Sequence, residues 1–212
     1  MTTKSLPKGW PVDGRVRYIN ENEFDKRIPR EIIQHFLRLP ITAITITTTT
    51  SPQANLLDSL EIHAVEDVPK SVVIRPIAAQ SHPANGQYGL FAAKKIAPYA
   101  HVLNYNGLVV LDEHASPTSD YCFRVNSFLA IDAEFCGSQA RFINDYRGVA
   151  QRANAEFKVF RDAKKGGVCV GVFSLKEGIG KGQEILLSYG KGFWKARAAV
   201  EDVEDYDEMV EV

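Results

Sequence analysis

Short apolar stretches broken by Gly, Pro and Asn dominate the chain from residue 71 onward. Runs of about four to eight residues rich in Val, Ile, Phe and Tyr are typical of β-strands bounded by turns. The runs are SVVIRPI, HVLNYNGLVV, YCFRV, FLAIDA, AEFKVF, VCVGVFSL and EILLSY. The pattern therefore predicts a mainly β body of the α+β class over residues 70–195.

The two ends of the chain have different patterns. Residues 22–39 predict a helix, with Pro29 in its first turn and an apolar face. That face would hold Ile32, Ile33, Phe36 and Leu37. The run ITAITITTTTSP then favours an extended strand, and residues 53–60 favour a short helix. We therefore expect residues 1–69 to be a small N-terminal extension. Residues 196–212 should form a C-terminal helix and an acidic tail.

Composition narrows the class of protein. The 212 residues are 45% apolar and 24% charged, which suits one globular domain. No apolar run approaches the roughly 20 residues that span a bilayer. The first residues lack the apolar core of a signal peptide. We therefore expect an intracellular protein without a membrane partner. Nothing in the sequence indicates the oligomeric state.

Charge is unevenly distributed. The last twelve residues, EDVEDYDEMVEV, contain seven acidic and no basic side chains. A solvated tail is the simplest interpretation, and a tail that attracts a basic partner is the alternative. The chain has no dense Lys/Arg run, so the sequence gives little support for direct nucleic-acid binding.

The cysteines do not indicate a metal centre. Cys122, Cys136 and Cys169 are far apart, odd in number and form no CxxC. Neither a disulfide framework nor a zinc cluster is expected from this spacing.

Four segments contain candidate chemistry: NGQYGLFAAKKI (85–96), HVLNYNGLVV (101–110), residues 129–157 and residues 171–194. A glycine turn before a strand allows a ligand to approach the backbone, although one such turn is weak evidence. Taken in order, the segments resemble the SET domain of lysine methyltransferases. YGLFAAKKI resembles the cofactor loop GxGLFA, and NYNG resembles EYxG. AIDAEFCGSQARFIND resembles IDAxxxGNxARFINH, and GIGKGQEILLSYG resembles IxxGEELxxDYG.

The resemblance covers residues 71–194 and implies both fold and activity. The implied fold is a set of small curved β-sheets with a threaded C-terminal segment, a rare exception to unknotted topology. The implied activity is methylation of a protein lysine by S-adenosylmethionine, which becomes S-adenosylhomocysteine. On family grounds the substrate would be a basic tail, histone H3 first, and the nucleus is favoured over the cytoplasm. A non-histone lysine methyltransferase and an inactive SET-like chromatin adaptor stay open as alternatives.

The resemblance also assigns residues around the target lysine. Tyr189 matches the closing Tyr whose hydroxyl lies by the transferring methyl, and Tyr105 matches the lysine-channel Tyr of EYxG. The alternative for each is an ordinary buried tyrosine. Phe157 and Leu187 are the candidates for lining the space around the amine. Neither has a hydroxyl, which favours di- or trimethylated products.

A second group of residues is assigned to the cofactor by the same resemblance. Asn144 matches the Asn that contacts it, and Asp145 follows in the position that holds the adenine through its backbone. The complete set is Gln87, Tyr88, Gly89, Tyr121, Arg141, Phe142, Asn144, Asp145 and Trp194. A loop Asn that bonds its own turn is the alternative for Asn144. Core packing is the alternative for Tyr121, and for Trp194 with Phe193.

Several positions depart from the family pattern, which is why the adaptor alternative is kept. Gln87 replaces the first Gly of GxG, and Asp145-Tyr146-Arg147 replaces His-Ser-Cys after Asn144. The other departures are Asn104 for Glu, Ser138 for Asn, Ala153 for Pro, Gln183 for Glu and Ser188 for Asp. No cysteine follows Cys169, so the zinc-binding post-SET cysteines are missing and no zinc is expected.

Overall fold

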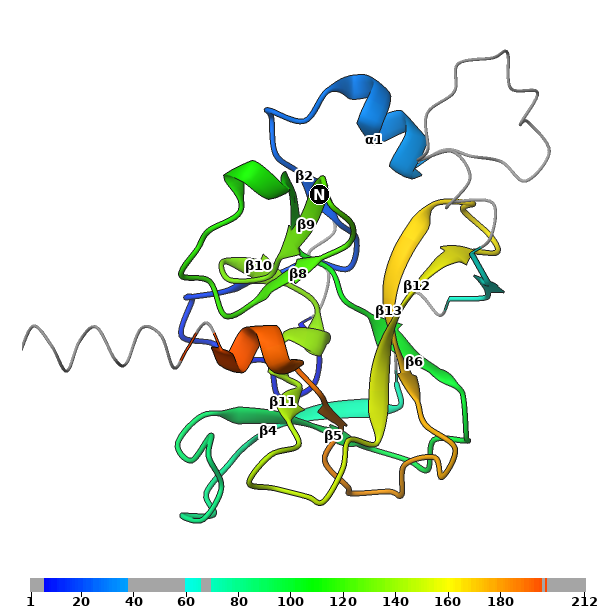
Figure 1. The fold of residues 1–212 in the computed structure, drawn as a ribbon. Helices are drawn as coiled ribbons and strands as arrows, with labels where there is room; N and C mark the ends of the chain where they lie inside the picture. Colours follow the sequence, from blue (N-terminus) through cyan, green and yellow to red (C-terminus); the bar gives the residue numbers. More distant parts are fainter. Residues whose placement is uncertain (1–5, 38–59, 66–69, 196, 198–212) are drawn as a thin grey trace, which may run out of the picture.

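The computed structural model describes residues 6–37, 60–65, 70–195 and 197 (Figure 1). Most of these residues form short strands, with few short helices between them, which confirms the predicted mainly β body. The predicted Ile/Thr strand, the helix after it and the acidic tail lie outside the described residues.

Within the described residues the strands form two sheets of four and three pairs. The first sheet has the order β3-β12-β13-β6: Ile62–His63, Ala155–Asp162, Val168–Ser174 and His101–Asn104. The second has the order β2-β7-β9-β8: Glu23–Phe24, Leu108–Leu111, Leu129–Asp132 and Cys122–Arg124. The pairs are β4-β5 (Val72–Pro76, Tyr88–Ala92), β1-β10 (Arg17–Tyr18, Cys136–Gly137) and β11-β14 (Asn144–Asp145, Leu186–Leu187). In Figure 1 the β12–β13 hairpin stands on one side of the molecule and β8 and β9 on the other, with β4 and β5 beneath.

The N-terminal segment adds strands to the body. Arg17–Tyr18 runs parallel to Cys136–Gly137, and Glu23–Phe24 runs parallel to Leu108–Val109. Helix α1 begins at Arg30, so the predicted helix is wrong over residues 22–29. Pro29 is where the helix can begin, because its missing N–H costs nothing in a first turn. Before it, Glu23 N–H donates to Gly107 O and Asp25 N–H donates to Val109 O of β7, while Ile28 N–H donates to Asp25 O in a turn.

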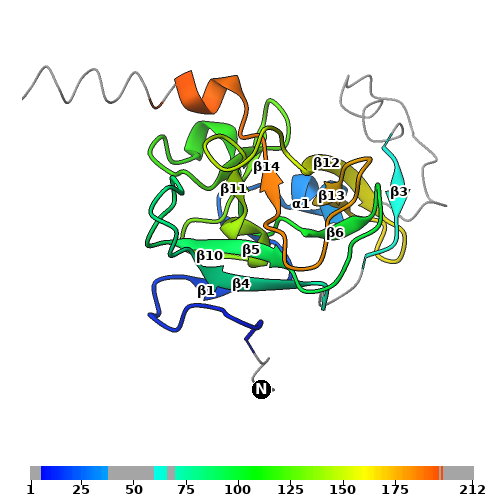
Figure 2. The ribbon, with the colours of Figure 1, turned by 90° about the horizontal axis from the view of Figure 1, so that it is seen from below.

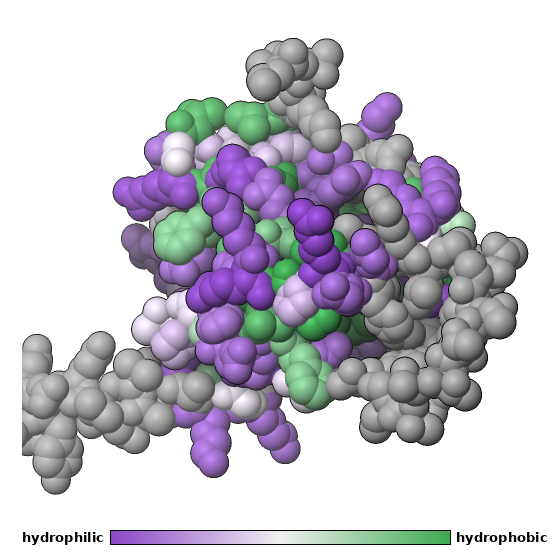
Figure 3. Space-filling view, turned by 90° about the horizontal axis from the view of Figure 1, so that it is seen from above, coloured by the Kyte–Doolittle hydropathy of each residue, from purple (hydrophilic) through white to green (hydrophobic). Residues whose placement is uncertain are grey.

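The core lies between the small sheets. Leu90, Val109 and Ile131 are fully buried, each from a different strand. On β13, Val168, Val170 and Val172 belong to the core and alternate with Cys169 and Gly171. Every second residue of the strand therefore faces the core, as expected for a β-strand. From above, hydrophilic residues cover most of the surface, with small apolar areas between them (Figure 3).

The C-terminal segment passes between two parts of the chain. On one edge, Ala92 N–H donates to Gln183 O and Ile185 N–H donates to Leu90 O. On the other edge β14 pairs in parallel with β11, and the two are seen next to each other in Figure 2. The Asn154 amide completes this arrangement, donating to Glu184 O at 2.7 Å and accepting from Leu186 N–H at 2.9 Å. This is the threaded segment that the sequence predicts.

Three short helical turns complete the described body. They are the 3₁₀ turns η1 (Asp112–His114) and η2 (Gln139–Phe142), and the helical residues 191–195 after β14. In η2, Ser138 caps the turn by accepting from Ala140 N–H. No helix in the described part of the chain is long and apolar enough to cross a membrane.

Candidate functional site

A pocket of about 780 Å³ opens where the N-terminal segment, the loop before β5, the region of β11 and residues 189–197 meet. A volume of this size is typical of small-molecule sites. Most of the predicted cofactor residues line it: Gln87, Tyr88, Tyr121, Arg141, Phe142, Asn144, Asp145 and Trp194. Tyr189 lines it as well. Gly89, Tyr105, Phe157 and Leu187 are not among the lining residues.

Asn144 is held at the pocket by its own side-chain amide. Its Nδ2 donates to Glu184 Oε1 at 2.9 Å and to the backbone oxygen of Tyr88 at 3.3 Å. Both amide hydrogens are therefore used within the protein. The remaining Oδ1 is the atom that can accept a hydrogen bond from a ligand.

Asp145 is buried, and its carboxylate joins three segments. It accepts from the N–H of Tyr189 at 2.7 Å, from the N–H and guanidinium of Arg147, and from the indole of Trp194 at 3.4 Å. Burial alone would raise the pKa of Asp145, but these hydrogen bonds outweigh it and the pKa is lowered. The Asp that replaces the family's His therefore organises the pocket wall with its side chain.

Tyr189 is a partly buried residue of the pocket wall. Its hydroxyl donates to the backbone oxygen of Ile143 at 2.7 Å, and its ring stacks on Trp194 at an interplanar angle of 14°. Burial raises the pKa of Tyr189, and the charge of Asp145 raises it further. The phenol is therefore neutral near neutral pH.

Tyr105 is buried and belongs to an aromatic cluster whose other two rings are partly buried. Its hydroxyl donates to Tyr121 O at 2.6 Å, and its ring centre is 5.3 Å from that of Phe157. Phe123 completes the cluster, 4.8 Å from Phe157, and was not predicted. Burial raises the pKa of Tyr105 well above its ordinary value, and a charge on Tyr189 would add to this effect. Tyr121, which lines the pocket, thus links the aromatic cluster to it through its backbone oxygen.

The family model for the SET domain matches residues 87–190. These residues form a SET domain. The match includes Asn144, Tyr105 and Tyr189 but leaves out the N-terminal segment and part of the loop before β5. No match was found among curated proteins.

Solved structures similar to this chain include Polycomb Repressive Complex 2 from Chaetomium thermophilum. A humanized mutant bound to the inhibitor GSK343 is 24% identical, with a TM-score of 0.46, over 58% of this chain and 16% of that one. The autoinhibited conformation of ctPRC2 bound to S-adenosylmethionine is 23% identical, with a TM-score of 0.47, over 66% of this chain and 17% of that one. The present chain therefore spans less than a fifth of those chains.

One wall of the SET-domain pocket comes from outside the family match. Trp10, Pro11, Asp13, Arg15 and Val16 line it. Trp10 is buried, with its ring centre 5.3 Å from that of Phe142. At its N-terminal end the loop packs closely on β4 through Gly9, where a Cβ would lie 2.0 Å from Ile74 O. At its C-terminal end it is held by the pairing of β1 with β10. The sequence contains no motif that would reveal this wall.

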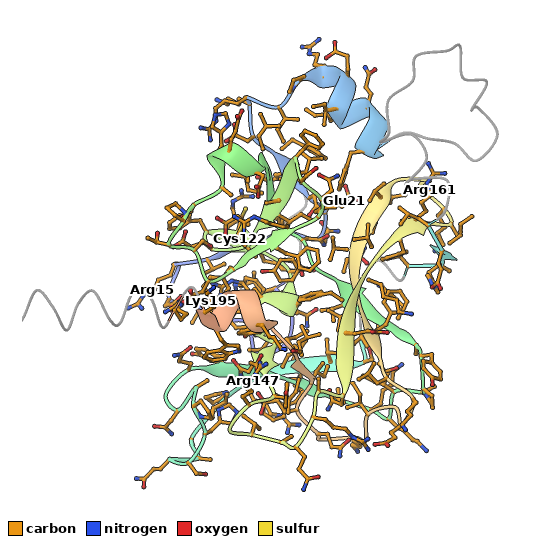
Figure 4. All side chains as sticks on the ribbon, in the orientation of Figure 1. Arg15, Glu21, Cys122, Arg147, Arg161 and Lys195 are labelled. Atoms are coloured by element: carbon orange, nitrogen blue, oxygen red, sulfur yellow. The ribbon has the colours of Figure 1, made fainter. Side chains whose placement is uncertain are left out.

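Cationic side chains surround the pocket. The Nε of Arg141 donates to Ala133 O at 2.9 Å, and its guanidinium lies 4.1 Å above the ring of Tyr121. Arg197 pairs with Asp120 at the rim and so joins the C-terminal helical region to the segment before β8. Arg15 and Arg147 also line the pocket, and Figure 4 shows both next to the orange helical segment.

Two predicted site residues act through packing. Gly89 is buried on β5, where a Cβ would lie 2.7 Å from Glu184 Oε1, so glycine allows this carboxylate to approach. Leu187 is 1% exposed in the core and pairs with Asp145 across β11–β14. Neither residue lines the pocket, so any effect of theirs on a ligand would be indirect.

The described residues contain no group of three or more His, Cys, Asp or Glu side chains that could hold a metal ion. Cys122, Cys136 and Cys169 are free thiols. Burial raises the pKa of all three, and that of Cys169 reaches about 12. They are therefore protonated thiols at neutral pH, and thiolate is the form that binds zinc.

Proposed function

We propose that this chain is an S-adenosylmethionine-dependent protein-lysine N-methyltransferase. The observation that carries the proposal is the position of Tyr189. It lines the SET-domain pocket together with Tyr121, whose backbone oxygen accepts the hydroxyl hydrogen of Tyr105 from the aromatic cluster. A ligand in the pocket and a lysine among the aromatic rings would therefore meet at Tyr189.

The pocket residues suit S-adenosylmethionine, which supplies an electrophilic methyl group on a sulfonium when bound. Tyr88, Phe142 and Trp194 offer aromatic surface for an adenine. Asn144 Oδ1 offers an acceptor for a donor on the cofactor, and the carboxylate of Glu184 lies directly behind it. A negative charge there favours a cationic ligand. Asn144, Asp145, Arg141 and the residues of the 87–88 turn are thus proposed to hold the cofactor.

The two tyrosines constrain the incoming amine. Each hydroxyl donates its hydrogen to a backbone carbonyl, Tyr189 to Ile143 and Tyr105 to Tyr121. Each oxygen therefore presents only lone pairs to a substrate, so it can accept an amine N–H but cannot donate to the amine nitrogen. The nitrogen lone pair stays available for in-line attack on the methyl carbon. Since both pKa values are raised, neither phenol is the base that deprotonates the lysine.

The aromatic cluster supplies the lysine site in this proposal. The rings of Phe123, Phe157 and Tyr105 pack against one another and offer an apolar surface suited to a methylene stem. Aromatic faces also tolerate the methylated ammonium that forms. The substrate proposed first is a histone H3 tail lysine, with the nucleus as the place of action. A non-histone lysine substrate is the second candidate, because nothing in the described pocket distinguishes the two.

The test is a methyl-transfer assay by mass spectrometry. Purified protein and S-adenosylmethionine are incubated with an array of lysine peptides that includes the H3 tail and tails of ribosomal and translation proteins. Mass increments of 14, 28 or 42 Da on a lysine, with one S-adenosylhomocysteine per methyl group, are the expected result. Calorimetric binding of S-adenosylmethionine without transfer to any peptide would favour the inactive adaptor. No binding of the cofactor would contradict the proposal outright.

A further inference from the structure

His82 occupies a place in the pocket that the proposed chemistry leaves unexplained. It lies in the loop between β4 and β5 and lines the pocket. Its Nε2 is 3.1 Å from Oε2 of Glu184, which is 102 residues further along the chain. Their side chains are 9% and 10% exposed, so this is a buried polar pair. Burying a polar side chain costs free energy unless the side chain forms a hydrogen bond.

The hydrogen-bond partners define the tautomer of His82. The backbone N–H of Ala84 donates to Nδ1 at 3.0 Å, so Nδ1 is the acceptor nitrogen. The hydrogen of a neutral ring is then on Nε2, which donates it to Glu184. Both ring nitrogens are thereby satisfied within the protein.

Glu184 passes this constraint to Asn144. One carboxylate oxygen accepts from His82, and the other accepts from Asn144 Nδ2 at 2.9 Å. Since a carboxylate can only accept, it must face the NH₂ side of the Asn144 amide, never the oxygen side. The second amide hydrogen goes to Tyr88 O. The amide therefore cannot flip, and Oδ1 is the atom offered to a ligand.

The same contact fixes the loop that carries His82. At its base, Gly86 N–H donates to Ile77 O and Ile77 N–H donates to Gln87 O. At its tip, the His82–Glu184 bond ties the loop to the strand segment beside β5. Pro83, Ala84 and Gln87 of this loop also line the pocket. Loss of the tip contact would release one pocket wall as well as the Asn144 amide.

We propose that His82 is a positioning residue for the cofactor, acting through Glu184 on Asn144. This inference rests on the proposed function, because it assumes that the pocket holds S-adenosylmethionine. His82 acts on the cofactor only through Glu184 and Asn144, so it affects the affinity for the cofactor and does not change the rate of the methyl-transfer step.

The experiment compares wild type with His82→Leu, His82→Gln and His114→Gln. Leu removes the donor. The Gln amide N–H can take the place of Nε2–H and donate to Glu184. His114, on η1, lies outside the pocket and is the matched control. The calorimetric Kd for S-adenosylmethionine, the KM for cofactor and for peptide, and kcat are measured for each protein.

His82→Leu should raise the Kd and KM for S-adenosylmethionine about tenfold or more, the effect of leaving a buried polar group unpaired. The kcat and the peptide KM should stay within about threefold of wild type, and His82→Gln should recover most of the lost affinity. Cofactor affinity of His82→Leu equal to that of wild type overturns the inference, as does a fall confined to kcat. A wild-type protein that does not bind the cofactor contradicts the proposed function itself, which keeps the two failures apart.

A second variant covers the case in which His82→Leu does not fold. Gly89→Ala leaves His82 intact but places a Cβ 2.7 Å from Glu184 Oε1, so the carboxylate must move. The same rise in cofactor Kd is expected because Asn144 loses its fixed acceptor. A folded Gly89→Ala protein with wild-type affinity overturns the inference.

Discussion

The carboxylate of Asp145 accepts a hydrogen bond from the backbone N–H of Tyr189 at 2.7 Å. Asp145 lies on β11, and Tyr189 follows β14, its parallel neighbour. The bond therefore extends the pairing of these two short strands to a tyrosine that lines the pocket. Since Arg147 and Trp194 donate to the same carboxylate, one side chain positions several parts of the pocket wall.

Asp145→Asn should lower the free energy of unfolding at neutral pH by about 1–3 kcal/mol, because one acceptor oxygen is replaced by a donor. The pKa of Asp145 is lowered in the folded protein, so its ionisation stabilises the fold above the ordinary pKa of about 3.9. That stabilisation is lost as the pH falls through the folded-state pKa. The difference between wild type and variant should therefore shrink below pH of about 4.

Denaturant unfolding measured at a series of pH values checks this prediction. Asp13→Asn is the control, because the side chain of Asp13 is 49% exposed. The control should stay close to wild type throughout. A stability difference for Asp145→Asn that does not change between neutral and strongly acidic pH would contradict the argument.

Asn144→Ala should weaken binding of S-adenosylmethionine about tenfold to a hundredfold. The substitution removes the proposed acceptor Oδ1 and leaves Glu184 Oε1 without its amide donor. Calorimetry gives the dissociation constant. Asn126→Ala, in the turn before β9, is a suitable control because Asn126 bonds only its own turn among the described residues. An unchanged dissociation constant for Asn144→Ala would place the cofactor elsewhere.

The sequence predicts the strands of the body because they are short apolar runs, with Gly, Pro or Asn in many of the segments between them. The β12–β13 hairpin and β9 lie where these runs predict. The N-terminal strands were missed for a physical reason. Arg17–Tyr18 and Glu23–Phe24 are two residues long, which is too short to show alternation, and they exist only through parallel pairing with distant strands.

Some residues of the candidate site could likewise be predicted from the sequence and others could not. Motif residues such as Asn144 and Tyr189 could be assigned because resemblance assigns roles position by position. Trp10 and His82 could not, because their roles depend on contacts with Phe142 and Glu184 that only the folded chain creates. Phe123 was missed since one Phe in a strand-like run gives no sign of which aromatic residues it will face.

Tyr189→Phe should lower turnover about 10²–10³-fold, the effect of losing one well-placed polar group in a dry site. The hydroxyl also satisfies Ile143 O, so a modest loss of stability of about 0.5–1.5 kcal/mol is expected with the fold retained. Single-turnover methyl transfer with saturating cofactor separates the chemical step from binding. A purified Phe variant with near wild-type turnover would remove Tyr189 from the catalytic role.

The number of methyl groups added should depend on Phe157. Its ring lies 5.3 Å from Tyr105 and 4.8 Å from Phe123, and it has no hydroxyl to hold a water beside the amine. Without a bound water, room is left for a methyl group, so the wild type should form di- or trimethyl-lysine. Phe157→Tyr supplies a hydroxyl and should shift the product toward monomethyl-lysine.

Time-resolved mass spectrometry of a good peptide substrate follows the three products, with Phe123→Tyr as the control within the same cluster. Leu187 was the second candidate for this space, but it is 1% exposed in the core. Leu187→Tyr should therefore overpack the core and cost about 1–3 kcal/mol of stability, with no specific change in the product ratio. Purely monomethylated product from the wild type at long times would refute the claim. Phe123 and Phe157 are neighbouring rings, so either could lie beside the lysine amine. If Phe123→Tyr shifted the product toward monomethyl-lysine and Phe157→Tyr did not, Phe123 would be the side chain that sets the number of methyl groups added.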